Sequence, residues 1–139
     1  MVIQRWQSVY LLLAVFAMIL TCIRPFGFVI NPDGTSLELI SFDFPILLTV
    51  NILTGVLLLI DIFLYKNLRF QRLVAAVCIV LLIASTATAF LILANSGDVW
   101  EIAWSGAPVG LVCALICTLF ARYRMSCDEK ILKSYDRIR

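Results

Sequence analysis

The residue in this 139-residue chain whose chemistry most needs an explanation is Asp61, a carboxylic acid inside an otherwise apolar segment. A carboxylate in such a segment is costly to bury, which makes it a default candidate for a proton or ion path. Asp61 precedes Lys66 by five residues, or about 7–8 Å of helix, so we expect it near the edge of a membrane rather than at its midplane. An ion pair with Arg5 is the favoured interpretation, and a role in transport is the alternative.

Other polar residues in the apolar segments recur at helical spacing. Asn51, Thr54 and Asp61 fall on one face of one segment, and Ser85 and Thr88 fall on one face of the next. Together they form a candidate intramembrane polar site. Asn51 lies deeper than Asp61, and buried Asn and Thr commonly hold membrane helices together by hydrogen bonds. For Asn51 we therefore favour a structural role.

The groups that usually support catalysis or metal binding are missing from the sequence. It contains no histidine, no Gly-rich phosphate loop and no nucleophile beside an activating group. Its five cysteines form no CxxC pair, so neither a zinc site nor a redox pair is expected. We predict that the protein is not an enzyme, that it has no cofactor and no metal, and that it does not bind nucleic acid.

The elements that must position the polar residues follow from composition. Hydrophobic residues make up 63% of the chain and charged residues 14%, against about 45–50% and about 25% in soluble domains. An 18-residue helix is about 27 Å long, close to the roughly 30 Å of bilayer hydrocarbon. Four uncharged runs reach or approach that length: 6–23, 44–60, 73–96 and 102–121.

These runs predict an all-α membrane protein with a single integral-membrane domain over residues 1–139. We expect helices over about 6–24, 44–65, 72–95 and 107–124 and a separate tail over 125–139. Short connections make consecutive helices antiparallel neighbours, so the fold class is a four-helix, up-down-up-down transmembrane bundle. The bilayer itself is then the first partner of the protein.

Basic residues are distributed unevenly around these helices. Ten of the eleven lie before the first uncharged run, between the second and third runs, or after the fourth, and Arg24 is the exception. Acidic residues gather in the first and third connections, on the other side. Because Lys and Arg are enriched in cytoplasmic loops, both termini are predicted to be cytoplasmic.

The two outer connections have their own predicted structure. FGFVINPDGTSLELISF places two β-prone runs around Asn31–Gly34, where Pro and Gly favour a tight turn. It predicts a short β-hairpin that caps the outer end of the bundle. GDVWEIAWSGAP is expected to lie along the outer surface, with Trp100 and Trp104 one helical turn apart.

Small residues indicate where helices approach closely, because lipid provides no hydrophobic drive for association. Gly55, Gly106 and Gly110 are the candidate helix-packing residues. The Gly106-x-x-x-Gly110 step is also a candidate interface between copies of the chain.

The C-terminal tail, DEKILKSYDRIR, carries seven charged residues among twelve. Ile131, Tyr135 and Ile138 recur at i, i+4 and i+7, which predicts a short amphipathic helix on the cytoplasmic side. An anchor for anionic headgroups needs only bases, whereas this tail also contains acids. We therefore predict a docking element, either for the bundle's own inner loop or for another protein. The candidate docking residues are Lys66, Arg69, Arg72, Lys130, Lys133, Arg137 and Arg139.

Three stretches of the sequence resemble a known family. They are MVIQRWQSVYLLLAV, LYKNLRFQ and the terminal DEKILKSYDRIR. Through them the whole chain resembles the family described as domain of unknown function 4293, small four-helix membrane proteins of Bacteroidota. The resemblance implies a multi-pass location in the bacterial inner membrane and the four-helix topology. It brings no catalytic residue to this chain.

Two functions of different classes fit these observations. In the first, the protein is an accessory or structural subunit that docks through its cytoplasmic loop and tail onto a larger membrane complex, with a protein or a second copy of the chain as partner. In the second, it is a small transporter or proton-conducting protein that uses the polar stripe around Asp61. We favour the first, because neither half of the sequence repeats the other and no discontinuous helix is evident near the midplane.

Overall fold

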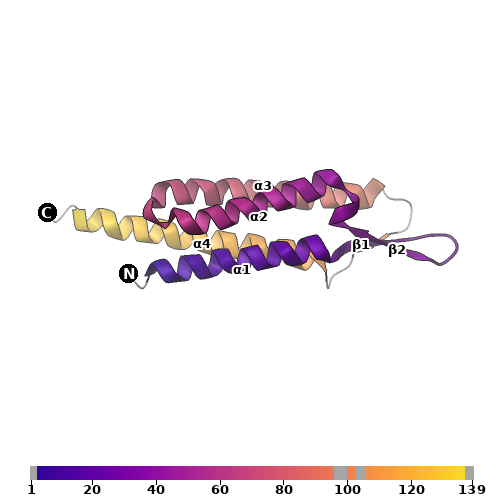
Figure 1. Ribbon diagram of the computed structural model, residues 1–139. Helices are drawn as coiled ribbons and strands as arrows, with labels where there is room; N and C mark the ends of the chain where they lie inside the picture. The colour runs from indigo at the N-terminus through magenta and orange to yellow at the C-terminus, as the bar shows by residue number, and fades with distance from the viewer. Residues whose placement is uncertain (1–2, 96–99, 103–105, 137–139) are drawn as a thin grey trace.

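The structure, a computed structural model, describes residues 3–95, 100–102 and 106–136. Within these ranges it leaves out the side chains at positions 3–5, 100–102, 132, 135 and 136. Four helices dominate the described part: α1 (Ile3–Ile23), α2 (Pro45–Phe63), α3 (Leu68–Asn95) and α4 (Ala107–Asp136). Figure 1 shows them along one long axis, with consecutive helices running in opposite directions. The predicted up-down-up-down bundle is confirmed.

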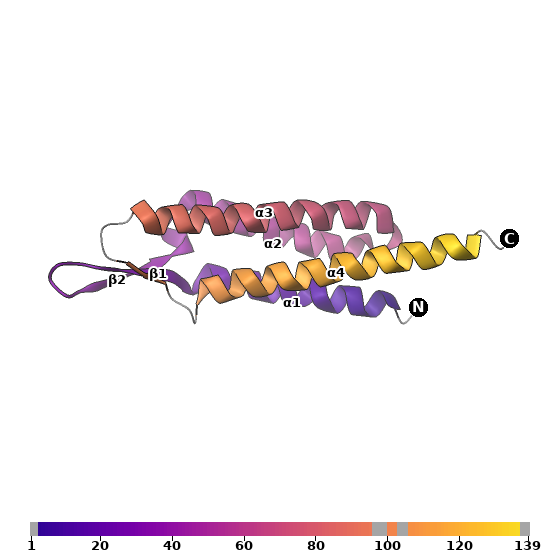
Figure 2. The same ribbon diagram turned by 180° about the vertical axis from the view of Figure 1, so that it is seen from behind.

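Each helix packs against two others, so the bundle is closed. α1 contacts α2 and α4, and α3 contacts the same two helices. Figure 2 shows α4 lying along α1 over most of their length. The inward faces supply small and aliphatic side chains that are fully buried, among them Leu11, Ala14, Leu58, Leu82 and Ala114. The core therefore runs the length of the bundle.

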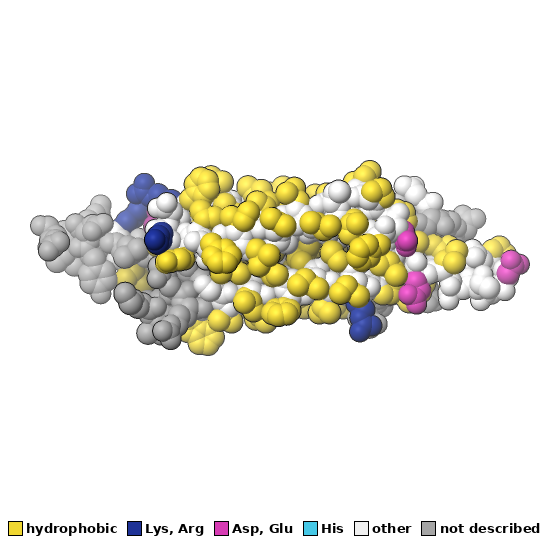
Figure 3. All heavy atoms as spheres, viewed as in Figure 1, with side chains coloured by type: hydrophobic (Ala, Val, Ile, Leu, Met, Phe, Trp, Pro, Cys, Tyr) yellow, Lys and Arg dark blue, Asp and Glu magenta, His cyan; other side chains and the backbone are white. Residues whose placement is uncertain are grey.

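The outward faces carry the hydrophobic side chains that suit lipid. Phe16, Ile46 and Val80 are all more than half exposed. Figure 3 shows hydrophobic side chains over the middle of the molecule and charged ones toward its two ends. All four helices are long and apolar enough to cross a membrane. The arrangement is that of an integral membrane protein whose apolar belt faces the acyl chains.

A small antiparallel sheet stands at one end of the bundle. β1 (Pro25–Ile30) and β2 (Ser36–Ile40) form the predicted hairpin. Its turn is closed by a Gly34 N–H that donates to the Asn31 carbonyl at 2.9 Å, and Gly34 has φ +77°, which side chains with a Cβ rarely adopt. The tip of the hairpin extends beyond the bundle (Figure 1), while its base, at Phe26, is buried.

The sheet also has a third strand that the sequence did not predict. β3 (Trp100–Ile102) pairs antiparallel with β1, so the strand order is β2-β1-β3. The stretch around Trp100 was expected to lie along the outer surface with a helical repeat. The strand forms because the edge of β1 offers unpaired N–H and C=O groups to the passing chain. Trp104 lies outside the described residues.

Two helix boundaries differ from those predicted. A loop over residues 66–71 was expected between the second and third helices. The observed connection is shorter, because α2 passes into η2 (Leu64–Lys66) and α3 already begins at Leu68. The C-terminal helix is also not a separate element, since α4 continues unbroken to Asp136. With 30 residues, α4 is about 45 Å long, roughly 15 Å more than the hydrocarbon needs. Its last turns therefore extend past the hydrocarbon.

Candidate functional site

The candidate docking residues gather at one end of the bundle, where α1 begins, α2 turns into α3 and α4 ends. We call it the basic end, because Lys66, Arg69, Arg72, Lys130 and Lys133 all lie there. Both Arg69 and Arg72 lie on α3 rather than in a loop. Being three residues apart, they stand on neighbouring positions of one helix face. This places both guanidinium groups beside the extension of α4.

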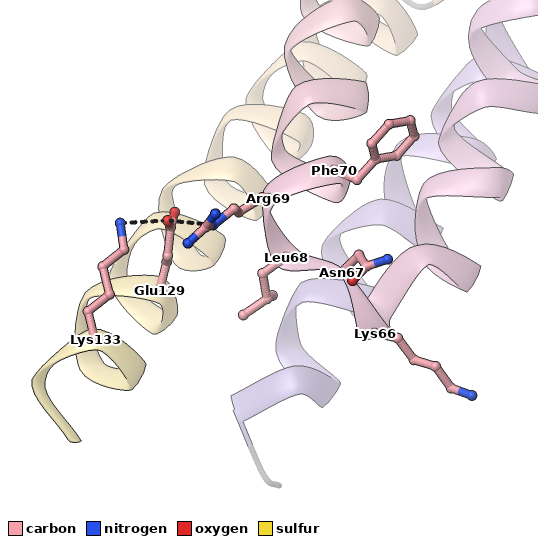
Figure 4. Close-up of a pocket in the computed structure, with 7 residues that line it drawn as sticks. All are labelled: Lys66, Asn67, Leu68, Arg69, Phe70, Glu129 and Lys133. Carbon is pink, nitrogen blue, oxygen red and sulfur yellow. Dashed lines mark ion pairs between the residues drawn. The ribbon is translucent and has the colours of Figure 1, made fainter. Parts of the chain in front are cut away.

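Glu129 of α4 ties the basic end together. Its carboxylate accepts from the Arg72 guanidinium at 2.6 Å and from the Lys133 amine, one turn along the same helix, at 2.9 Å. Arg69 is at the limit of an ion pair, 4.0 Å away. The Glu129 side chain is only 12% exposed, whereas that of Arg69 is 84% exposed. One shielded acid thus holds three bases around it. Figure 4 shows two of them, Arg69 and Lys133, on either side of Glu129.

A second contact fixes the other side of the α4 extension. Asp128 accepts a hydrogen bond from the side-chain amide of Gln7 on α1, and Gln7 is buried. Together, Asp128 and Glu129 bind α4 to α1 and α3. Asp128 and Glu129 are therefore used within the chain. Neither Gln7 nor Glu129 was among the predicted site residues. The Glu129–Lys133 spacing of i, i+4 was the available signal.

The contacts of Glu129 leave a hollow between the α2–α3 turn and α4. Its volume is about 570 Å³, and its lining residues are Lys66, Asn67, Leu68, Arg69, Phe70, Glu129 and Lys133. Figure 4 shows Arg69 lying toward Glu129 and Lys133 of α4, while the side chains of Lys66 and Phe70 point away from α4. Of the predicted docking residues, Lys66, Arg69 and Lys133 line it, whereas Arg72 pairs with Glu129 and is not among the described lining residues. Arg137 and Arg139 lie outside the described residues. We call this hollow the basic groove.

Asp61 lies on the inward face of α2, one helical turn from Leu58. Its side chain is fully buried, and both of its carboxylate oxygens lack a hydrogen-bond partner among the side chains that the structure describes. Beside it, Gln71 of α3 donates from its side-chain amide to the Asp61 backbone carbonyl at 3.1 Å. The predicted partner, Arg5, has its side chain outside the described residues. Gln71 was not predicted as a site residue, although a Gln in an inward register was a signal for it.

The deeper polar residues form a separate cluster toward the sheet end of the bundle. The Ser85 hydroxyl donates to the Asn51 side-chain carbonyl, and the Asn51 amide donates to the Ser41 hydroxyl at 3.4 Å. Ser41, in η1 (Ser41–Asp43), donates in turn to the Thr21 backbone carbonyl at 3.2 Å. This chain of hydrogen bonds joins α1, η1, α2 and α3. Asn51 therefore makes hydrogen bonds between helices, as expected for an Asn deep in a membrane segment.

The remaining members of the predicted stripe do not extend that cluster to Asp61. The Thr54 hydroxyl donates to the Val50 carbonyl, and the Thr88 hydroxyl donates to the Ser85 carbonyl, each within its own helix. Leu58 and Leu82 are fully buried in the core between the two polar groups. The structure thus brings Asn51 and Ser85 together and leaves Asp61 apart from them.

Comparison with known proteins places the chain in a family. The family model described as Domain of unknown function (DUF4293) matches residues 3–138. The chain belongs to the DUF4293 family. No curated protein and no solved structure matches it. The match covers both the basic end and the buried polar groups, so the candidate sites lie inside the region that defines this family.

The glycines of this DUF4293 chain serve helix packing in different ways. A Cβ at Gly110 would lie 2.5 Å from the Thr21 hydroxyl and 2.9 Å from the Ala17 carbonyl, so α1 and α4 approach closely there. Gly106 is buried as well. Their face is therefore occupied within the chain, and the Gly106-x-x-x-Gly110 step is not free to join two copies. At Gly55 an added Cβ would meet nothing within 4 Å, so no close approach explains it.

Proposed function

We propose that this protein is an accessory subunit of a larger membrane complex and that its basic groove receives an acidic segment of a partner protein. The observation that carries the proposal is the position of Glu129, which holds α4 against α3 through Arg72 at 2.6 Å. Because α4 and its neighbours are fixed before any partner arrives, little conformational entropy is lost on docking. The groove is in this sense preorganised.

The charges in the groove favour an acidic partner. Arg69 and Lys133 have side chains that are 84% and 64% exposed, while Glu129, the only acid among the described lining residues, is 12% exposed. The accessible charge is therefore positive. Leu68 and Phe70 add apolar surface, and Phe70 is 57% exposed. A segment that combines carboxylates with an apolar side chain would satisfy both features.

The same proposal assigns the protein to the bacterial inner membrane, with the basic end and both termini in the cytoplasm. It is supported by the enrichment of Lys and Arg in the segments at that end. The start of α1 and the end of α4 lie at the same end of the bundle (Figure 1). A cysteine-accessibility experiment with Lys66→Cys and Leu37→Cys would place the two ends on their sides of the membrane.

Photocrosslinking tests the docking. A photoreactive amino acid at Leu68 in cells is expected to capture one membrane protein in stoichiometric amount, with the cross-linked peptide rich in Asp and Glu. Arg69→Glu should abolish capture, because it reverses a charge of the groove whose side chain is 84% exposed. Arg122→Glu is the matched control, because Arg122, which lies on α4, is exposed like Arg69 but is not among the described residues that line the groove. Capture of a phospholipid in place of a protein would refute the proposal.

The transport alternative receives less support from the geometry. It needs a polar path along α2, and the described path is interrupted by the buried Leu58 and Leu82. Asn51 and Ser85 are occupied by each other and by Ser41. We therefore do not extend the proposal to transport.

A further inference from the structure

Three buried oxygen atoms at the basic end have no donor among the described residues. They are the two carboxylate oxygens of Asp61 and the side-chain carbonyl oxygen of Gln71. Asp61 is 0% exposed and Gln71 is 1% exposed, so water does not reach either from outside. The amide of Gln71 already donates to the Asp61 backbone, which places both side chains against the same turn of α2. None of these three acceptors therefore has a hydrogen-bond donor among the described residues.

An ionised Asp61 would be poorly stabilised in this position. A charged carboxylate that is buried without a partner usually takes up a proton, because desolvation penalises the charged form. Asp61 also lies in the last turn of α2, which ends at Phe63. The helix dipole is negative there and opposes a second negative charge. Burial and the helix dipole thus both favour the neutral, protonated form of Asp61.

The charged and titratable groups of the surrounding elements do not offset that penalty. On α3, the Arg72 guanidinium is taken by Glu129, and the Cys78 thiol is buried. On α4, Asp128 and Glu129 are further acids. On η2, Lys66 lies on the exposed groove side. On α1, the Arg5 side chain is not described.

We infer that Asp61 and Gln71 form an occluded binding site for one proton. The proton bonds to a carboxylate oxygen of Asp61 and gives a neutral carboxylic acid. Its O–H is then a donor for the Gln71 carbonyl oxygen, so one proton removes the charge and supplies the missing hydrogen bond. The site is independent of the docking function, because none of the atoms involved lines the basic groove.

Infrared difference spectroscopy tests the inference on the purified full-length protein. The spectrum of the wild type minus that of Asp61→Asn at neutral pH is expected to show the C=O stretch of a protonated carboxylic acid. The band should disappear as the pH is raised to alkaline values, because the proton is then withdrawn. Gln71→Leu removes the acceptor and should shift the band to higher frequency. Absence of the band at neutral pH would overturn the inference.

Two further measurements separate the proton from other occupants. Replacing choline chloride with sodium chloride at constant ionic strength should leave the band unchanged, and its loss in sodium would assign the site to Na⁺ instead. Asp61→Asn should unfold at the same denaturant concentration as the wild type, since a neutral amide replaces a neutral acid. A marked loss of stability in Asp61→Asn that Arg5→Gln suppresses would identify an ion pair with Arg5 and overturn the proton site.

Discussion

Replacing Gly110 with alanine should loosen the packing of α1 on α4. The added Cβ would lie 2.5 Å from the Thr21 hydroxyl oxygen and 2.9 Å from the Ala17 carbonyl oxygen. Thr21 cannot simply rotate away, because its hydroxyl donates to that same carbonyl at 2.9 Å. The Ala17 oxygen belongs to the backbone of α1. One helix must therefore move to admit a single methyl group.

The size of the effect follows from two opposing terms. Overpacking a filled site costs about 1–3 kcal/mol, whereas Ala in place of Gly within a helix gains about 0.8–1 kcal/mol. We expect Gly110→Ala to lower the free energy of unfolding by about 1 kcal/mol, with the extremes of the two ranges giving about 0–2 kcal/mol. Gly55→Ala is the matched control, because a Cβ there meets nothing within 4 Å. The control should gain stability by up to about 1 kcal/mol.

Reversible unfolding in mixed detergent micelles, with an increasing fraction of a denaturing detergent, measures both variants against the wild type. The difference between them isolates the steric term, since the gain in helix propensity is common to both. We expect Gly110→Ala to be less stable than Gly55→Ala by about 1–3 kcal/mol. Equal stability of the two variants would refute the close approach of α1 and α4 at this glycine.

Two more predictions concern the polar contacts between helices. Asn51→Leu should lower the free energy of unfolding by about 1–3 kcal/mol, because it leaves the buried Ser85 hydroxyl without its acceptor and reduces Ser41 to its bond with the Thr21 carbonyl. Thr49→Val, whose exposed hydroxyl bonds within α2, is the control, and an equal loss in both would contradict the structural role of Asn51. Glu129→Gln should release the end of α4, because it weakens the pairs with Arg72 and Lys133. Trypsin should then cut at Lys133 severalfold faster than in the wild type, and raised salt should speed cleavage of the wild type in the same way. An unchanged cleavage rate in Glu129→Gln would show that Glu129 does not hold the helix.

Features of the fold that depend on neighbouring residues in the chain were predictable from the sequence. The uncharged run over residues 73–96 predicts a membrane helix, and α3 covers most of it. Asn31–Gly34 predicts a turn, and the hairpin forms around it with Gly34 at φ +77°. β3 was missed because a strand of three residues is defined by the edge it pairs with rather than by its own pattern.

The candidate sites were harder to predict, because each depends on residues far apart in the sequence. Asp61 was singled out as an acid in an apolar segment, but its neighbour Gln71 becomes apparent only when α2 and α3 are packed together. Glu129 was counted as one of the tail's acids, and its pairing with Arg72 gives it a specific position. The stripe from Asn51 to Asp61 follows helical spacing, yet Leu58 separates its two ends in the core.

The sequence by itself determined that this is a membrane protein with four crossing helices, because segment length and apolar content are set residue by residue against the thickness of the bilayer. It also determined which segments carry the basic residues. The tertiary structure alone decided which polar groups meet. Gln7 and Asp128 are 121 residues apart and Asn51 and Ser85 are 34 apart, and such pairs form only when each helix has a fixed rotation and depth. Those two quantities result from packing between helices, which no single segment specifies.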